Sequence, residues 1–115
     1  MRALALCRES LILSQRLDNK AYIAFCLTAL AGIIQATGDP ARAARLFGVA
    51  EVLLESINAV LDPRGRLKYD NDLLAARLQL GTVAFAQEWQ QGRMMKADDA
   101  VIEAMGNGAQ EATVT

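Results

Sequence analysis

Apolar residues recur along this chain with the three- and four-residue spacing that places them on one face of a helix. Strong helix formers such as Leu, Ala, Arg, Glu and Gln dominate, and the sequence lacks β-branched clusters bounded by turn residues. The pattern predicts helices over about residues 2–17, 20–37, 40–60, 64–80, 83–93 and 98–105. We therefore expect an all-α fold of five or six antiparallel helices without a sheet.

Two proline-containing turns divide the predicted helices. In the first turn, Gly38 suits a left-handed helix end, Asp39 can cap the next helix, and Pro40 fits its first position. Asp62 and Pro63 repeat the last two of these signals. Short turns of this kind indicate that successive helices form hairpins.

The predicted helix over residues 20–37 is apolar nearly all round, which is typical of a helix buried on several sides. Its apolar centre, residues 21–34, is shorter than the roughly 20 residues that span a bilayer. At the N-terminus, Arg8 and Glu9 interrupt any apolar segment of a signal peptide. We expect a core helix and no membrane association.

The sequence matches itself when it is shifted by forty residues. Residues 2–17 then fall on residues 42–57, with Leu6 on Leu46 and Leu13 on Leu53. One face of the first predicted helix carries Ala3, Leu6, Cys7, Ser10, Leu13 and Leu17. Repeats of this size are typical of stacked helical hairpins.

The hairpin over residues 27–50 resembles the tetratricopeptide repeat. Large and small residues alternate at the positions where that motif packs its two helices, with a glycine at the turn. These positions are Leu27, Leu30, Ala31, Ile34, Gly38, Ala43, Phe47 and Ala50. Leu27 and Ile34 replace an aromatic residue and a tyrosine of the motif, and the forty-residue period is similar to that of the MalT-like subclass. We expect the apolar residues of this set, together with Leu46, to be buried together.

Residues 42–51 and 85–101 resemble the C-terminal end of large bacterial signal-transduction ATPases, the LuxR-type, winged-helix and cyclase-linked regulators. The landmarks are Trp89, Gly92, Arg93 and Met95. The resemblance implies a right-handed tetratricopeptide-type solenoid over residues 1–105. The Gly, Asn, Gln and Thr residues after it predict a flexible tail over residues 106–115. Ala97 stands where such proteins place a Ser or Thr cap, so we expect a weakly capped last helix.

The charge balance and the lack of histidine exclude several functions. Twelve basic and 13 acidic residues give a net charge of −1, without the basic surplus of a nucleic-acid-binding surface. Histidine, the commonest general base and zinc ligand, is missing. Cys7 and Cys26 lie in apolar helical segments and are expected to be reduced, as in a cytoplasmic protein, with a disulfide as the alternative.

Three small clusters of residues are candidates for functional sites. Asp98 and Asp99 fall at a helix start, where carboxylates are favoured, and Asp70 and Asp72 cannot share one helix face. A basic cluster could bind phosphate but fits a solvated helix start better; it consists of Arg64, Arg66 and Lys68. The aromatic pair Phe85 and Trp89 suits the closing of a solenoid end better than a ligand platform. We expect no catalytic residue, cofactor or metal, and no enzyme activity.

Two functions remain open at this point. The first is a protein-interaction module that binds a protein partner or the effector and ATPase domains of its own regulator. The alternative is a small-molecule sensor, which needs convergent polar groups in an apolar pocket. The buried polar candidates are Thr28, Gln35 and Ser10. So few polar groups favour the interaction module.

Because residues 2–17 match residues 42–57, the helix over residues 2–17 corresponds to the second helix of a repeat. This chain has no helix before it that could serve as the first helix of that repeat. We expect Leu4, Cys7 and Leu11 to face the position of that neighbour and to form an exposed apolar surface. Such surfaces are usually interfaces, and a two-fold dimer is the commonest arrangement. The sequence thus predicts a homo-oligomer through this helix.

Overall fold

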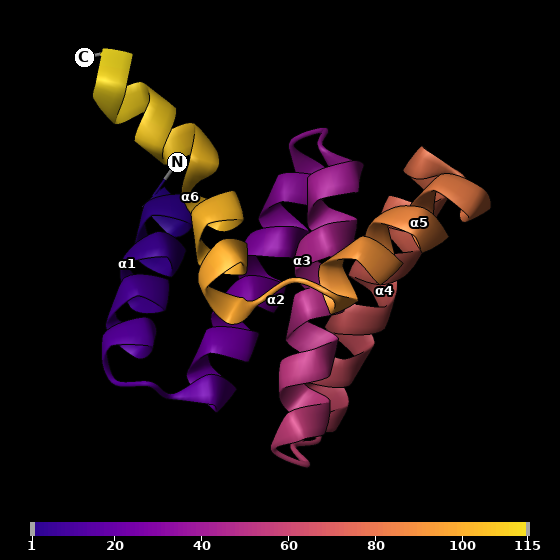
Figure 1. Cartoon of the computed structure of the whole chain (residues 1–115). Helices are drawn as coiled ribbons and strands as arrows, with labels where there is room; N and C mark the ends of the chain where they lie inside the picture. The colour runs from indigo at the N-terminus through magenta and orange to yellow at the C-terminus, as the bar shows by residue number, and fades with distance from the viewer. Residues whose placement is uncertain (1, 115) are drawn as a thin grey trace.

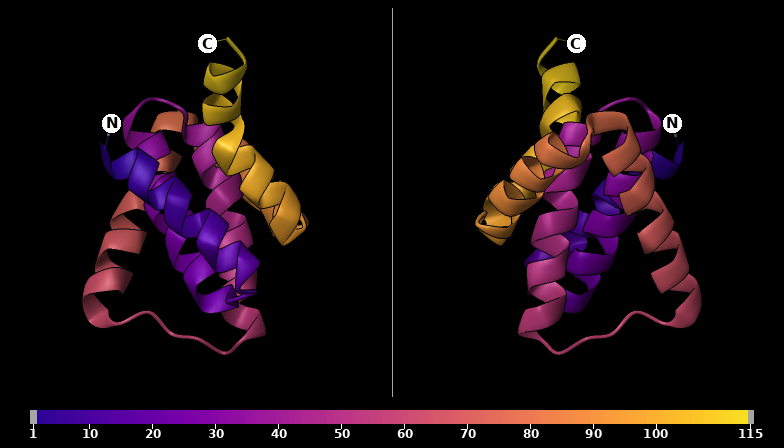
Figure 2. Two further views of the ribbon diagram at one scale, coloured as in Figure 1. Left: turned by 90° about the vertical axis from the view of Figure 1, so that its left-hand side faces the viewer. Right: turned by 90° about the vertical axis from the view of Figure 1, so that its right-hand side faces the viewer.

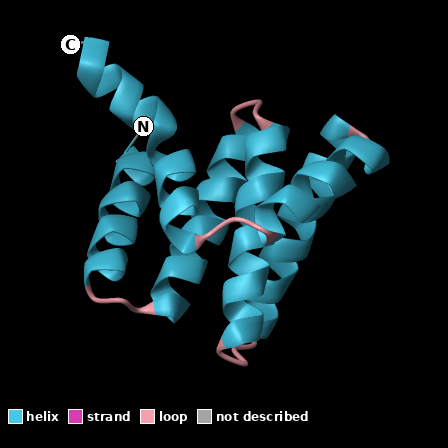
Figure 3. Cartoon of the chain, viewed as in Figure 1, coloured by secondary structure: helices cyan, strands magenta, loops and turns pink. Residues whose placement is uncertain are grey.

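A computed structural model describes the backbone of residues 2–114 and the side chains of residues 4–105. Six helices and no strand occur in this range (Figure 3), which confirms the predicted all-α class. The helices are α1 (Arg2–Arg16), α2 (Lys20–Ala36), α3 (Pro40–Ser56), α4 (Pro63–Leu80), α5 (Thr82–Arg93) and α6 (Ala97–Val114). No helix in the described range is both long and apolar enough to cross a membrane.

Side-chain caps fix the starts of three helices. Asn19, Asp39 and Asp62 each accept a hydrogen bond from the backbone N–H three residues ahead, at the starts of α2, α3 and α4. Pro40 and Pro63 occupy the first helical positions, as the sequence predicted. The caps explain why most predicted helix starts agree with the structure to within a residue or two.

Two helix ends differ from the prediction. Helix α3 ends at Ser56 rather than near residue 60, because Asn58 adopts a left-handed conformation with φ of 54°. Helix α6 does not stop at Met105 but continues to Val114, through the good helix formers of residues 109–112. Thr115 lies outside the described residues, and the flexibility of residues 106–115 stays a prediction.

Helix α3 lies at the centre of the molecule (Figure 1). It packs most extensively against α2 and α5 and also contacts α4 and α6. All eight residues predicted to be buried together belong to one core cluster with exposed fractions of 5% or less, which confirms that prediction. They are Leu27, Leu30, Ala31, Ile34, Ala43, Leu46, Phe47 and Ala50.

Helix α6 folds back across the molecule from α5 and contacts α1, α2 and α3. It lies on the opposite side of these helices from α4 (Figure 2). Its buried residues Ala100, Val101 and Ala104 join the same core cluster as Leu11 of α1. The last helix therefore closes the core between α1 and α3 instead of extending the row of hairpins.

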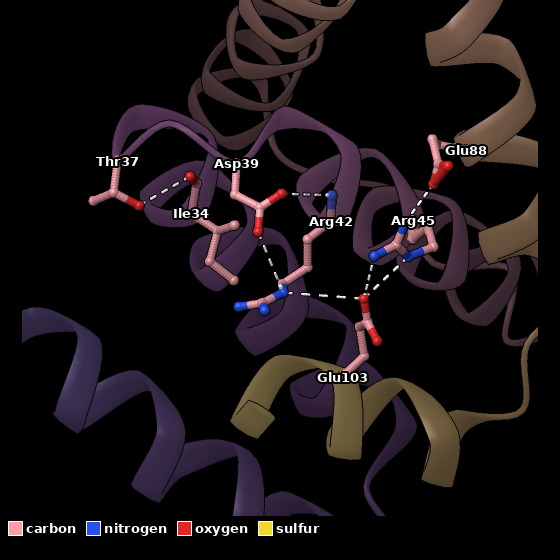
Figure 4. A network of polar contacts seen from close by, with 7 residues as sticks. All are labelled: Ile34, Thr37, Asp39, Arg42, Arg45, Glu88 and Glu103. Atoms are coloured by element: carbon pink, nitrogen blue, oxygen red, sulfur yellow. Dashed lines mark hydrogen bonds and ion pairs between the residues drawn. The ribbon is translucent and has the colours of Figure 1, made fainter. Parts of the chain in front are cut away.

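A polar network holds α6 on the centre of the fold (Figure 4). Arg45 of α3 donates hydrogen bonds to Glu88 of α5 and, at 3.0 Å from its Nε, to Glu103 of α6. Glu103 also lies 4.0 Å from the Nε of Arg42, which pairs with the cap residue Asp39. One arginine side chain thus ties α5 and α6 to α3.

The predicted orientation of α1 is wrong. Leu11 is fully buried, while Leu4 and Cys7 are partly buried and pack against the same core cluster, so these three residues do not form an outward surface. The reason is α6, which covers this side of α1 and accepts a 3.0 Å hydrogen bond at Asp98 from Gln15. The exposed apolar side chains of α1 are instead Leu6, Leu13 and Leu17.

Candidate interaction surface between α2 and α4

A groove runs between α2 and α4 on the side of the molecule away from α6. It encloses about 460 Å³. Its wall on α2 is formed by Phe25, Thr28 and Ala29, and its floor by the α3–α4 connection and by α4. The remaining lining residues are Val60, Leu61, Asp62, Gly65, Lys68, Tyr69 and Asp72.

Beside the groove, the Asp72 side chain of α4 lies close to Gly32 of α2. A Cβ atom at Gly32 would lie 2.7 Å from Oδ2 of Asp72, so a larger residue would displace that carboxylate. The same oxygen accepts a hydrogen bond of 2.8 Å from Nζ of Lys68, one turn earlier on α4. The Lys68–Asp72 ion pair therefore lies against Gly32 of α2. It places one positive and one negative charge next to each other on the groove wall.

Two aromatic side chains of α2 are exposed at or beside the groove: Phe25 lines it, and Tyr22 precedes Phe25 by three residues. Tyr22 and Phe25 are more than a third exposed and meet edge to face, with ring centroids 6.3 Å apart. Across the groove, Val60 is almost fully exposed in the α3–α4 connection. Exposed apolar side chains that line a groove are typical of surfaces that bind another protein.

Most polar atoms of the groove already have partners within the fold. The hydroxyl of Thr28 donates to the carbonyl oxygen of Phe25 at 2.8 Å, and Asp62 accepts from the backbone N–H of Gly65 at 2.7 Å. The buried hydroxyl of Tyr69 donates to Oε2 of Glu51 at 2.6 Å. Burial, and then this hydrogen bond, raise the pKa of Tyr69 well above its usual value. These hydrogen bonds hold the helices in place.

A second hollow, of about 370 Å³, lies between α3, α4 and α5. It brings Arg66 of the predicted basic cluster together with the predicted aromatic pair, Phe85 and Trp89, whose rings stack at 6.0 Å. Arg77 lies over the Phe85 ring at 5.1 Å, an additional contact that the spacing along the sequence did not indicate. The guanidinium of Arg66 forms an ion pair with Asp70 at 3.3 Å, so the carboxylate of Asp70 compensates its charge within the fold.

The other predicted clusters do not form sites. Arg66 and Lys68 bind separate carboxylates, those of Asp70 and Asp72, so the basic residues do not converge on one ligand position. No group of three potential metal ligands occurs among the residues whose side chains are described. Both cysteines are free, and burial raises the pKa of Cys26.

The polar residues considered for a sensor pocket are also separated. Thr28 lines the groove, Ser10 is exposed on α1, and Gln35 is buried near the end of α2. The Oε1 atom of Gln35 has no hydrogen-bond partner within the described part of the chain. The three groups therefore do not converge on one cavity.

Comparison of the chain with protein-family models, with curated proteins and with solved structures found no significant match.

Proposed function

We propose that this chain is a non-catalytic protein-interaction module that binds a partner segment in the groove between α2 and α4. The observation that carries the proposal is the composition of this groove. It combines exposed apolar side chains with a single ion pair, while its remaining polar groups are occupied within the fold. Such a surface can bury the apolar residues of a partner without leaving many unpaired polar atoms.

We further propose that the module is the C-terminal tetratricopeptide-type segment of a bacterial transcriptional regulator or signal-transduction ATPase that works in the cytoplasm. The support is the resemblance of residues 27–50, 42–51 and 85–101 to such proteins. The layout of the helices is compatible with it, since α2 and α4 contact each other. In stacked hairpins, the first helices of successive repeats line a common binding surface.

A peptide display experiment tests the groove. Peptides of random sequence are selected on the wild-type chain, and their affinities are compared with those for Phe25→Glu and for the control Ile102→Glu, an exposed position on α6. We expect selected peptides to lose about tenfold or more in affinity with Phe25→Glu, since hot-spot aromatics contribute at least about 1.4 kcal/mol. Their affinity for Ile102→Glu should equal that for the wild type.

Two results would reject this function. Selection could yield no peptide above background, or the selected peptides could bind Phe25→Glu as tightly as the wild type. Measuring the melting temperature with a panel of metabolites tests the alternative function. A small-molecule sensor would show a higher melting temperature with one class of compound. Such a rise, together with failure of the peptide selection, would replace the interaction module by the sensor.

A further inference from the structure

The outward side of α1 carries an apolar stripe, defined here as Leu6, Ser10, Leu13 and Leu17. The three leucines are 53%, 57% and 77% exposed, respectively, and Ser10 lies exposed between them. The steps along the stripe are four, three and four residues, which is the heptad spacing of a helix that packs along another helix. No other helix of the described chain buries the three leucines of this stripe, whereas Leu11, on another side of α1, is buried in the core cluster.

The internal repeat shows how an equivalent surface is used inside the molecule. Leu6 and Ser10 correspond to Leu46 and Ala50 of α3, which are fully buried in the core cluster that contains Leu27 and Leu30 of α2. The same pattern of residues is therefore compatible with close helix packing, with a small residue between two leucines. On α1 this packing surface is open.

The charges beside the stripe indicate what packs there. Glu9 and Arg16 are both exposed and lie seven residues apart, so they project from the same flank of the stripe. Neither has an ion pair within the part of the chain that the structure describes. If a two-fold axis perpendicular to α1 relates two copies, their α1 helices run antiparallel. The flank that carries Glu9 and Arg16 then faces the same flank of the other copy. Glu9 of one copy then meets Arg16 of the other, and the second pair forms by symmetry.

We infer that α1 is a homodimer interface in which two copies pack antiparallel along this stripe. In the register that fits the heptad spacing, Leu6 contacts Leu17 of the second copy and Ser10 contacts its Leu13. Two Glu9–Arg16 pairs between copies flank these layers, and such flanking charges select the orientation of packed helices. The inference is separate from the proposed function, because the stripe and the groove share no residue.

Sedimentation equilibrium of the full 115-residue chain at tens of micromolar tests the dimer. We expect the wild type to be dimeric and Leu13→Glu to be monomeric, while Leu78→Glu, which changes an exposed leucine on α4, stays dimeric. A monomeric wild type overturns the inference, and so does a dimer that survives Leu13→Glu. Far-ultraviolet circular dichroism of each variant verifies that its helices are retained.

Charge exchange tests the antiparallel register without altering the apolar stripe. Glu9→Arg or Arg16→Glu alone places like charges opposite each other at two positions, and we expect each to weaken the dimer about tenfold. The double variant Glu9→Arg with Arg16→Glu restores two opposite-charge pairs and should return to within about threefold of the wild-type affinity. If the double variant is no tighter than either single variant, the antiparallel two-fold arrangement is wrong.

Discussion

At the scale of single residues, two glycines determine how closely α3 and α5 approach. A Cβ atom at Gly48 would clash with the backbone of Trp89, and one at Gly92 would lie within 2.7 Å of backbone atoms of Arg45. Backbone cannot move aside as a side chain can, so both positions require glycine. Gly92 was noted from the sequence as a landmark of a family resemblance, but its packing role depends on a contact with α3 that no local pattern reveals.

Gly92→Ala should therefore destabilise the fold by about 1–3 kcal/mol, because overpacking forces backbone shifts. Gly32→Ala is the matched control, since its new methyl group meets only the end of the Asp72 side chain, which can rotate away. We expect the control to change the free energy of unfolding by less than about 1 kcal/mol. Urea denaturation measures both variants, and equal losses would contradict the close backbone contact.

The Tyr69 phenol gives the fold a dependence on alkaline pH. Its pKa is raised in the folded state by burial and by the hydrogen bond to Glu51, so its proton is held more tightly in the folded than in the unfolded chain. The contribution to stability is fully present below the unfolded pKa of about 10 and declines above it. The free energy of unfolding of the wild type should thus fall more steeply above pH about 10 than that of Tyr69→Phe. Identical slopes in urea titrations over this range would show that the phenol is not protected.

At the scale of helices, the agreement between sequence and structure follows the range of the interactions. The helix starts at Lys20, Pro40 and Pro63 depend on capping residues one position away, and the sequence predicted them well. The orientation of α1 depends on α6, more than eighty residues downstream, and was predicted wrongly. The groove could be predicted only in part. The sequence predicted the helices that form its walls, but the pairing of Lys68 with Asp72 beside Gly32 depends on the three-dimensional arrangement of α2 and α4.

Arg45 is the contact that fixes α6, and its planar guanidinium reaches two carboxylates at once (Figure 4). Arg45→Lys keeps the charge but cannot donate to Glu88 and Glu103 in this fork geometry. We expect faster amide hydrogen exchange in α6, by roughly five- to thirtyfold for a loss of about 1–2 kcal/mol in local stability. The control Arg93→Lys removes a similar fork to Glu55 outside α6, and it should leave exchange in α6 unchanged. Equal protection of α6 in both variants would show that Arg45 does not hold it.

At the scale of the whole molecule, the two proposed surfaces occupy different helices. The groove uses α2 and α4, whereas the stripe uses α1, so a dimer through α1 leaves both grooves free. A dimer with two grooves could bind a bivalent partner more tightly than a single copy does, because the second contact forms at a high effective concentration. No composition signal in the sequence indicated this arrangement, since it follows from which side of α1 the last helix covers.

The return of α6 to α1 also has a consequence for how the chain unfolds. In an open row of hairpins, each unit contacts only its neighbours, so the terminal units can melt one after another. Here the hydrogen bond from Gln15 to Asp98, and the burial of Leu11 and Ala100 in one core cluster, join the first helix to the last. Neither terminal helix can detach without exposing the core that the other one covers. We therefore expect α1 and α6 to lose their helical structure over the same range of urea concentration, which hydrogen exchange of the two helices at increasing urea would measure.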